Sequence, residues 1–372
     1  MIEAAERLAL VAERELEALV GVSTPSGDVA GAEEAVALCV AFLPPDAEPE
    51  RIDCSTPGHA RDLLGGLRGS GERRLLLVGH LDTVVAHGAH RTLTRERDRL
   101  LGSGTVDMKG GVALALGLMR ELAGRPERYA EVAVLLVNDE EWRTVPFAHT
   151  ERFRDWDACL CFEAGEVDAE GNDAVIVRRK AAGTLEVNAT GRPAHSGSAP
   201  HKGRSALLAL AAVAQRIASA GDPAGPDRLT AVPTILHAGE AFNVVPPNGR
   251  LVCDLRADDL AAFEPVLAAV PDELDGVSIE SALVRAWPGM DTRFATAGLL
   301  ERAAERLGRP LVASERGGAS DASHIAQAVP MTVDGLGPRG GGAHTPHEWV
   351  GADSLRSRAE VALALTASIL GD

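Results

Sequence analysis

The chain has 372 residues, a length that suggests two domains, and its 45% hydrophobic and 24% charged residues are typical of a globular protein. The formal net charge of −17 at pH 7 repels nucleic acid phosphates and anionic membranes, so we expect neither as a partner. No apolar run approaches the roughly 20 residues that are needed to span a bilayer.

The N-terminal residues and the cysteines both predict a cytoplasmic protein. Glu3 and Glu6 stand early in the chain, and the basic n-region of a signal peptide is missing. The five cysteines form an odd and scattered set, which argues against a disulfide framework and fits a reducing compartment. Cys159 and Cys161 lie in an apolar, strand-like run, and we interpret them as buried core thiols rather than metal ligands.

The first part of the chain alternates helical patterns with short apolar runs. Residues 2–20 carry apolar positions at helical spacing, and a loop signal follows at residues 23–28. A helix with a glycine-rich start is expected over residues 109–122. Buried strands are expected over residues 75–78, 132–137 and 158–162. This alternation predicts an α/β domain with helices on both faces of its sheet, and residues 1–178 form its first part.

The middle section, residues 179–287, has a different pattern and is interpreted as an inserted α+β domain. Its expected elements are three strand-like segments and two helices, at residues 184–190, 231–237, 250–256, 204–218 and 260–270. The α/β pattern then resumes, so residues 288–372 are expected to complete the first domain. This last part carries a helical pattern, a strand and a final helix at residues 296–307, 329–333 and 354–370.

Acidic and histidine side chains follow the apolar strands or sit in glycine-rich loops. These positions are His80, Asp107, Glu140, Glu141, Glu163 and His344. Because ligands bind at the carboxyl ends of strands in open α/β sheets, these side chains are expected to converge. Two histidines and several carboxylates suit zinc, with cobalt or manganese as substitutes, and a carboxylate can bridge a pair of metals because it has two oxygens.

Each of these motifs has an ordinary interpretation when it stands alone. A His-x-Asp sequence is usually a surface pair, two adjacent glutamates usually form a solvated turn, and a glycine-rich loop is often only a turn. Their joint occurrence in this order, at strand ends, favours a metal site. Asp82, two residues after His80, is expected to accept the ring N–H that does not bind metal and so to fix the tautomer.

The combined motifs resemble one known family. They are HLDTV at residues 80–84, DMKGG at 107–111, DEE at 139–141, Glu163 and His344. Together they resemble the dinuclear zinc metallopeptidases, which include glutamate carboxypeptidase, succinyl-diaminopimelate desuccinylase, acetylornithine deacetylase and aminoacylase. The resemblance covers nearly the whole chain. It implies a mixed-sheet zinc-peptidase catalytic domain with an inserted α+β lid or dimerisation domain.

The resemblance also implies a ligand set for two zinc ions. One ion would be held by His80 and Glu163, and the other by Glu141 and His344. Asp107 would bridge the two ions, and the peptide bond that follows it would be cis.

Two residues are implied to act in catalysis beside the metals. A water that bridges two zinc ions still needs a base to take its proton, and Glu140 is the candidate because it is adjacent to a ligand without being one. His195 matches the oxyanion-binding histidine of the family's inserted domain, which reaches the partner's active site in dimeric members. Without the resemblance, His195 would be an ordinary loop histidine.

Substrate binding is assigned by the same resemblance. Asn243 and Arg256 match positions that hold the free carboxylate of the substrate, and Ser320 matches a loop near the site. For Arg256 alone, a surface ion pair with Asp254 or Asp258 is the ordinary alternative. The expected partners are therefore a small molecule or short peptide with a free carboxylate and a second copy of the chain.

The expected activity is hydrolysis of an amide or peptide bond next to a free carboxylate, closest in look to the glutamate carboxypeptidase branch. An N-acyl-amino-acid deacylase of the acetylornithine deacetylase or desuccinylase type is the alternative. A serine hydrolase is disfavoured, because the sequence GASDA at residues 318–322 lacks the final glycine of a nucleophile elbow. A catalytically inactive homologue that binds a peptide is the alternative from another class.

Overall fold

The computed structural model describes residues 1–371, which fold as two compact units. The first unit contains residues 1–178, 290–316 and those from 320 onward, and the second contains residues 179–289 and 317–319. The expectation that the inserted unit serves as a lid or dimerisation domain stays a prediction.

The first unit is built on a six-stranded sheet in the order β1-β2-β6-β3-β7-β17. The strand bounds are Glu48–Ile52 (β1), Asp62–Arg68 (β2), Arg74–His80 (β3), Glu131–Val137 (β6), Ala158–Cys161 (β7) and Thr332–Val333 (β17). β6 and β7 run parallel to β3 on its two sides, whereas β1 and β2 run antiparallel to their neighbours. The sheet is therefore mixed, and the predicted α/β fold class is confirmed.

The central strands are buried on both faces, which explains their continuous apolar sequences. Side chains alternate across a strand, so Leu75 and Leu77 of β3 enter one hydrophobic core while Leu76 and Val78 enter another on the opposite face. Cys159 and Cys161 are buried in the second core as free thiols.

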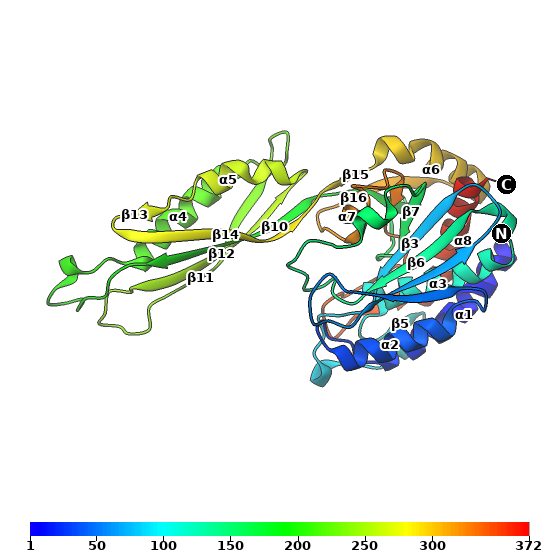
Figure 1. Cartoon of the computed structure of the whole chain (residues 1–372), viewed down its shortest axis with the longest axis horizontal. Helices are drawn as coiled ribbons and strands as arrows, with labels where there is room; N and C mark the ends of the chain where they lie inside the picture. The colour runs from blue at the N-terminus through cyan, green and yellow to red at the C-terminus, as the bar shows by residue number, and fades with distance from the viewer. Residues whose placement is uncertain (372) are drawn as a thin grey trace. The chain divides into compact units, whose positions relative to one another are not determined.

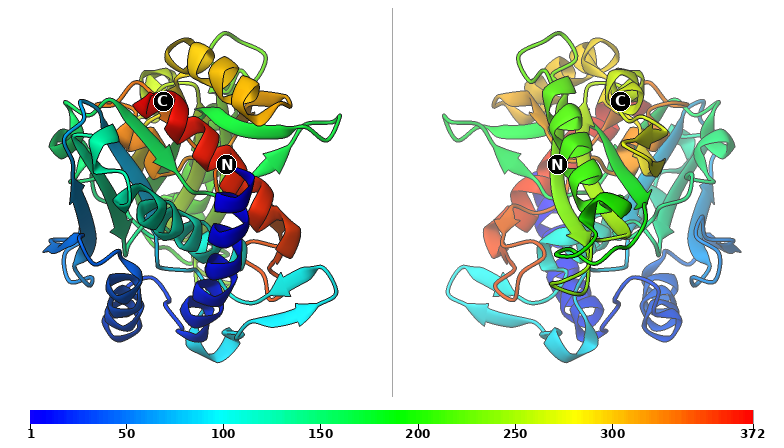
Figure 2. Two further views of the ribbon diagram at one scale, coloured as in Figure 1. Left: turned by 90° about the vertical axis from the view of Figure 1, so that its right-hand side faces the viewer. Right: turned by 90° about the vertical axis from the view of Figure 1, so that its left-hand side faces the viewer.

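Helices pack against the six-stranded sheet and against one another. Their bounds are Ile2–Gly21 (α1), Val29–Phe42 (α2), Gly110–Ala123 (α3), Arg293–Leu307 (α6), Asp321–Ile325 (α7) and Ala352–Leu370 (α8). α1 packs against α3 and α8, and α3 packs on β3 and β6 (Figures 1 and 2). As a result, the start of α1 and the end of α8 lie near each other in the first unit (Figure 2). Among residues 1–371, no helix is both long and apolar enough to cross a membrane.

Two smaller sheets complete the first unit. One has the order β18-β19-β5-β4, and the other has the order β15-β9-β16 with β8 paired to β9. Their bounds are Thr94–Glu96 (β4), Arg99–Leu101 (β5), Glu166–Val167 (β8), Asp173–Arg179 (β9), Met290–Asp291 (β15), Leu311–Arg316 (β16), Gly340–Gly341 (β18) and Trp349–Gly351 (β19).

The second unit is an antiparallel five-stranded sheet with helices and a core of its own. The strand order is β11-β12-β10-β14-β13, so β11 and β13 are the edges. The bounds are Ala181–Thr190 (β10), Ala206–Ala220 (α4), Thr230–Ala238 (β11), Asn248–Ala257 (β12), Glu264–Ala268 (α5), Glu273–Leu274 (β13) and Val277–Trp287 (β14). Leu185, Leu210 and Leu251 are among the side chains that fill its core.

Some expected elements differ from those observed. The helix expected over residues 260–270 is wrong in extent, because a 3-10 turn at Leu260–Phe263 precedes a helix of only five residues. The strand expected over residues 329–333 shrinks to Thr332–Val333, because the amide of Val329 donates to the carbonyl of Ile325 and continues the turn after α7. β14 was not expected from the sequence. Most of its side chains are not buried, so its sequence lacks the apolar pattern by which strands were identified.

Candidate metal centre

His80 is the last residue of β3 and is almost completely buried. Its ring Nδ1 lies 3.0 Å from the backbone carbonyl oxygen of Asp82. This contact orients the ring so that Nε2 faces two carboxylates, 3.1 Å from Oδ1 of Asp107 and 3.7 Å from Oε1 of Glu163. Glu163 follows β7, the strand parallel to β3, so neighbouring strand ends bring these side chains together.

Asp107 lies in the turn that leads into α3, and its peptide bond to Met108 is cis, as the resemblance implied. Its two carboxylate oxygens face different histidines. Oδ1 lies 3.1 Å from Nε2 of His80, and Oδ2 lies 3.1 Å from Nε2 of His344. A single carboxylate therefore stands between two groups of potential ligands, which is the arrangement that a bridging ligand requires.

His344 comes from the loop between β18 and β19, and its backbone adopts a φ of 63°, in the left-handed region that is uncommon for residues other than glycine. Its Nε2 lies 3.2 Å from Oε2 of Glu141, a residue that follows β6. The structure thus forms two groups, His80 with Asp107 and Glu163, and Asp107 with Glu141 and His344. Within each group the potential ligand atoms all lie within 4.8 Å of one another.

The electrostatics of these groups fit cations. Oε1 of Glu141 is buried and has no hydrogen-bond partner among residues 1–371, and burial raises the pKa of this carboxyl. Hydrogen bonds to Asp107 and Glu141 raise the pKa of His344 to about 10. A proton on His344 therefore balances carboxylate charge in the absence of any other cation. Nitrogen and carboxylate oxygen donors at this spacing suit zinc and related divalent metals.

Asp82 acts differently from the expectation. Its backbone carbonyl, not its carboxylate, is the closer acceptor for the His80 ring, since the nearest carboxylate oxygen is 3.5 Å away. The two carboxylate oxygens instead accept hydrogen bonds from the backbone amides of Glu140 and Glu141, each at 3.1 Å. Asp82 therefore orients both the His80 ring and the backbone that carries the two glutamates.

Glu140 is buried at 8% exposure and belongs to neither ligand group. Burial raises the pKa of its carboxyl well above the usual value, and the nearby carboxylate of Glu163 adds to this effect. A buried carboxyl with a raised pKa is the kind of group that can exchange protons, and the catalytic role of Glu140 stays a prediction.

An ion network that the sequence did not reveal lies next to Glu140. The guanidinium of Arg143 is fully buried and donates to Asp139 at 2.8 Å and also to Asp321. Asp139 additionally accepts from the amide and the hydroxyl of Thr56. The network ties the segment after β6 to the start of α7, and only the position of Arg143 within three residues of Glu140 hinted at it.

Glu348 is a second residue that the sequence reasoning missed. Its buried carboxylate accepts hydrogen bonds from the backbone amides of Gly104, Val106 and Asp107, at 2.7, 2.8 and 3.0 Å. Because Glu348 lies four residues after His344, these bonds fasten the His344 loop to the Asp107 turn. Its place in the motif around His344 was the available signal, but three-dimensional proximity to residues 104–107 was not readable from spacing.

Three of the predicted site residues, His195, Asn243 and Arg256, lie in the second unit. Nδ1 of His195 accepts hydrogen bonds from the amides of Gly197 and Ser198, at 3.1 and 3.2 Å. The carbonyl of Asn243 accepts from the amide of Ser196 at 2.9 Å, so the loops that carry His195 and Asn243 are joined.

Arg256 and Ser320 are engaged in contacts of their own. Arg256, on β12, forms an ion pair with Asp254 at 2.9 Å, which is the ordinary alternative considered from the sequence. Ser320 is 1% exposed, and its hydroxyl donates to Asp334 at 2.6 Å. The hydroxyl of Ser320 is therefore not exposed in this structure, and its assignment to substrate binding stays a prediction.

The sequence of the chain is similar to those of known peptidases and deacylases. The model of peptidase family M20/M25/M40 matches residues 76–368. Carboxypeptidase G2 of a Pseudomonas species is 26% identical over 372 residues, covering 94% of this chain and 87% of that protein. Succinyl-diaminopimelate desuccinylase of Rhodospirillum centenum is 30% identical over 312 residues, covering 77% of this chain and 79% of that protein.

Solved structures give the same fold. The crystal structure of aminopeptidase PepT from Bacillus cereus matches with a TM-score of 0.79 at 21% identity, covering 98% of this chain and 99% of that one. The M20 family metallo-carboxypeptidase Sso-CP2 from Sulfolobus solfataricus matches with a TM-score of 0.74 at 16% identity, covering 96% and 99%. At these identities the solved structures bear on the fold alone.

The role of Glu348 leads to a first prediction. Glu348→Ala leaves three backbone amides unsatisfied in a buried place, so we expect the free energy of unfolding to fall by about 1–3 kcal/mol. We also expect weaker metal binding, because the Asp107 turn is no longer fastened to the His344 loop. Chemical denaturation and cobalt titration measure the two effects.

The matched control is Glu301→Ala, which truncates an exposed glutamate on α6. It should change neither quantity. Wild-type stability and wild-type cobalt affinity in Glu348→Ala would contradict the role given to this residue.

Proposed function

The chain belongs to peptidase family M20/M25/M40 and is a metal-dependent hydrolase, and from this we propose that it cleaves an amide or peptide bond next to a free carboxylate. The observation that carries the proposal is the position of Asp107 between two histidine–carboxylate groups at the strand ends. The carboxypeptidase relative matches 94% of the chain at 26% identity and the desuccinylase relative 77% at 30%, so the choice of peptide cleavage over deacylation is part of the proposal.

Two divalent ions, zinc by preference with cobalt or manganese as substitutes, are the proposed cofactors. One would be held by His80 and Glu163, the other by Glu141 and His344, with Asp107 shared. The free Oε1 of Glu141 and the carboxylate excess support this ligand set. When bound, such ions polarise the scissile carbonyl and lower the pKa of the attacking water.

Glu140 is the proposed general base. Its carboxylate takes a proton from the water as the oxygen bonds to the substrate carbonyl carbon. It then delivers this proton to the amide nitrogen as the carbon–nitrogen bond breaks. Burial supports both steps, since a raised pKa makes Glu140 a stronger base than an exposed carboxylate and a usable acid afterwards. Asp82 holds the backbone amide of Glu140 and so keeps the carboxylate in place.

His195 is the proposed donor to the oxyanion. Because Nδ1 accepts two backbone amides, the proton of the neutral ring must sit on Nε2. The side chain is exposed, so this N–H is available to a group outside the second unit. A preorganised N–H donor is what an oxyanion needs.

The substrate carboxylate is proposed to meet Arg256 and Asn243. Arg256 presents a planar fork of donors, but Asp254 occupies it in this structure. Substrate binding therefore requires that the substrate carboxylate replaces Asp254 at the guanidinium. Separation of Arg256 from Asp254 costs little free energy, since partly exposed ion pairs contribute little to stability.

A homodimer is proposed through the second unit. β11 is an edge strand, and α4 packs beside it. Exposed apolar side chains gather on these two elements: Leu207, Leu208, Val232, Ile235 and Leu236. A twofold copy would cover both the apolar surface and the open edge. A bulge after Pro233 interrupts the edge, so pairing is expected along residues 235–238.

Two alternatives differ in measurable ways. An N-acyl-amino-acid deacylase would use the same centre and prefer acyl amino acids to peptides that end in glutamate. An inactive peptide-binding homologue would bind metal without turnover. The presence of Glu140, a buried carboxyl that belongs to neither group of candidate metal ligands, argues against this alternative. A serine hydrolase lacks support, because the hydroxyl of Ser320 is bonded to Asp334.

The general base can be tested directly. Glu140→Gln should lower kcat by about 10²- to 10⁴-fold, because the proton acceptor is lost, while metal content stays unchanged. The assay uses peptides that end in glutamate beside N-acyl amino acids, so the preferred class is identified in the wild type. Near-normal kcat in Glu140→Gln would rule out this role, and Glu127→Gln, at an exposed position, serves as the control.

The dimer and the action of His195 in the partner's site can be tested together. His195→Ala and Glu140→Ala chains are each expected to be inactive. Mixed under conditions that exchange subunits, they form dimers in which one site has both residues intact. Random exchange then restores about one quarter of the wild-type activity. No recovery despite proven exchange would contradict action in trans, and a monomer in light scattering would contradict the dimer.

A further inference from the structure

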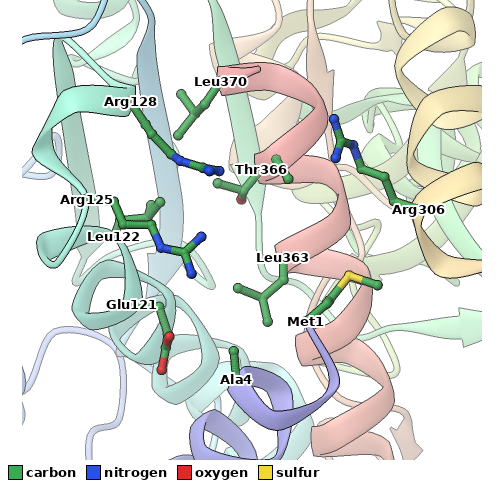
Figure 3. A pocket seen from close by; sticks show the side chains of 11 residues that line it. Met1, Ala4, Glu121, Leu122, Arg125, Arg128, Arg306, Leu363, Thr366 and Leu370 are labelled. Carbon is green, nitrogen blue, oxygen red and sulfur yellow. The ribbon is translucent and has the colours of Figure 1, made fainter. Parts of the chain in front are cut away.

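A cavity of about 410 Å³ lies at the start of α1 and the ends of α3 and α8, and none of the candidate metal ligands lines it (Figure 3). Of the three arginines in its lining, Arg128 and Arg306 already have partners in the protein, and Arg125 is an exposed surface side chain. The lining therefore does not specify a ligand. Buried charges that no step of the reaction has used lie elsewhere in the first unit, around the segment that carries Glu140.

Four buried charged side chains gather beside the candidate metal centre. They are Asp139, Glu140, Arg143 and Asp321, and each is at most 8% exposed. The charges of Asp321 and Arg143 both act on the carboxyl of Glu140. The cluster thus holds one guanidinium among three carboxyl groups. Because charges interact strongly in a buried place, the position of this guanidinium governs how the carboxyl groups are arranged.

The guanidinium of Arg143 is held on several sides. One terminal nitrogen donates to Oδ1 of Asp139 at 2.8 Å, and the other donates to Oδ1 of Asp321. The ring of Phe147 covers one face, with its centroid 4.6 Å from Cζ. The two carboxylates come from different segments, one after β6 and the other at the start of α7. A planar fork of donors can span both, which a lysine ammonium cannot do in the same way.

Glu140 depends on its backbone for its position. Within residues 1–371, its carboxyl forms no hydrogen bond and no ion pair. Its backbone amide donates to Asp82, and the side chain of the preceding residue, Asp139, is bonded to Arg143. A shift of Asp139 would therefore move the backbone from which Glu140 projects, and no bond of the Glu140 side chain itself would resist this movement.

The neighbouring candidate ligand, Glu141, has more support. Its amide donates to Asp82 at 3.1 Å, and its Oε2 lies 3.2 Å from Nε2 of His344. The side chain of Glu141 is thus held at both of its ends. A change at Arg143 is therefore expected to disturb Glu140 more than it disturbs Glu141.

Stability alone does not explain the buried ion network. Removal of two charges from water costs free energy, and a buried ion pair is often no more stabilising than apolar side chains of the same size. What Arg143 supplies, and an apolar side chain would not, is a directional connection between Asp139 and Asp321. A directional connection fixes geometry, and geometry is what a general base requires.

We propose that Arg143 is a positioning residue for Glu140, an inference that rests on the proposed role of Glu140 as general base. By joining Asp139 to Asp321, Arg143 fixes the backbone on either side of Glu140, so that its carboxyl stays where the attacking water and the leaving nitrogen can exchange a proton with it. Arg143 is fully buried and acts only through Glu140. A displacement of about 1 Å in a reacting group lowers the rate by about 10²-fold, so this support has a measurable effect.

Steady-state kinetics on the full, metal-loaded chain test the proposal with Arg143→Lys. This variant keeps the positive charge but loses the planar fork that spans both carboxylates. We expect kcat to fall by about 10- to 100-fold, while KM and the visible absorption spectrum of the cobalt-loaded enzyme stay unchanged. The matched control is the same substitution at an exposed arginine, Arg154→Lys, which should leave kcat unchanged.

A second variant decides the question if Arg143→Lys does not fold. Arg143→Met combined with Asp321→Asn removes one positive and one negative charge, so the charge balance of the cluster is kept. We expect kcat to fall by at least about ten-fold in this variant too. Thermal unfolding and metal analysis accompany each measurement. Wild-type kcat in either folded variant would overturn the proposal. A loss of kcat together with a changed cobalt spectrum would overturn it in favour of support for the ligand Glu141.

A double-variant cycle separates positioning from a general structural role. If Arg143 acts through Glu140, Arg143→Lys should change the residual kcat of Glu140→Gln by less than about two-fold. A further loss of about ten-fold in that background would overturn the proposal. The same assay distinguishes the two levels of the account. Near-normal kcat in Glu140→Gln would refute the general base and this inference with it, whereas an impaired Glu140→Gln beside a fully active Arg143→Lys would refute the role of Arg143 alone.

Discussion

The concentration of carboxylates beside the ends of three parallel strands, two of them after strands and one in the turn before α3, is the constraint on which the rest of the structure depends. Asp107, Glu141 and Glu163 converge with two histidines in a partly buried place. Like charges at this spacing repel, and burial adds to the cost of ionising them. Cations bound between these carboxylates would turn this cost into an attraction. The parallel pairing of β3 with β6 and β7 sets the positions of His80, Glu141 and Glu163, whereas Asp107 and His344 reach the candidate centre from loops.

Other buried carboxylates hold the backbone around this centre. Asp82 accepts the amides of Glu140 and Glu141, and Glu348 accepts three amides of the turn that contains Asp107. Each bond to a charged acceptor is stronger than a neutral one, so these turns are well fixed. The loops that carry the candidate ligands, which come from distant parts of the sequence, are thereby joined directly to one another.

The sequence predicted the convergence of ligands because each follows a buried strand or sits in a glycine-rich loop, and strand ends meet at one edge. The sequence could not predict which buried carboxylates accept hydrogen bonds from backbone amides. An acidic residue such as Glu348 looks the same in a sequence whether it faces solvent or three backbone amides. The bond from the Ser320 hydroxyl to Asp334 was unreadable for a related reason, since position in a loop does not tell where a hydroxyl points. β14 escaped notice because its partly exposed side chains lack a clear apolar alternation.

The central claim is that Asp107 joins two metal positions. A crystal structure of the zinc-loaded protein, with anomalous scattering measured on both sides of the zinc absorption edge, tests it most directly. The account predicts two zinc peaks, one on each side of Asp107, the first next to His80 and Glu163 and the second next to Glu141 and His344. A single peak that Asp107 does not contact, or zinc bound by other side chains, would contradict it.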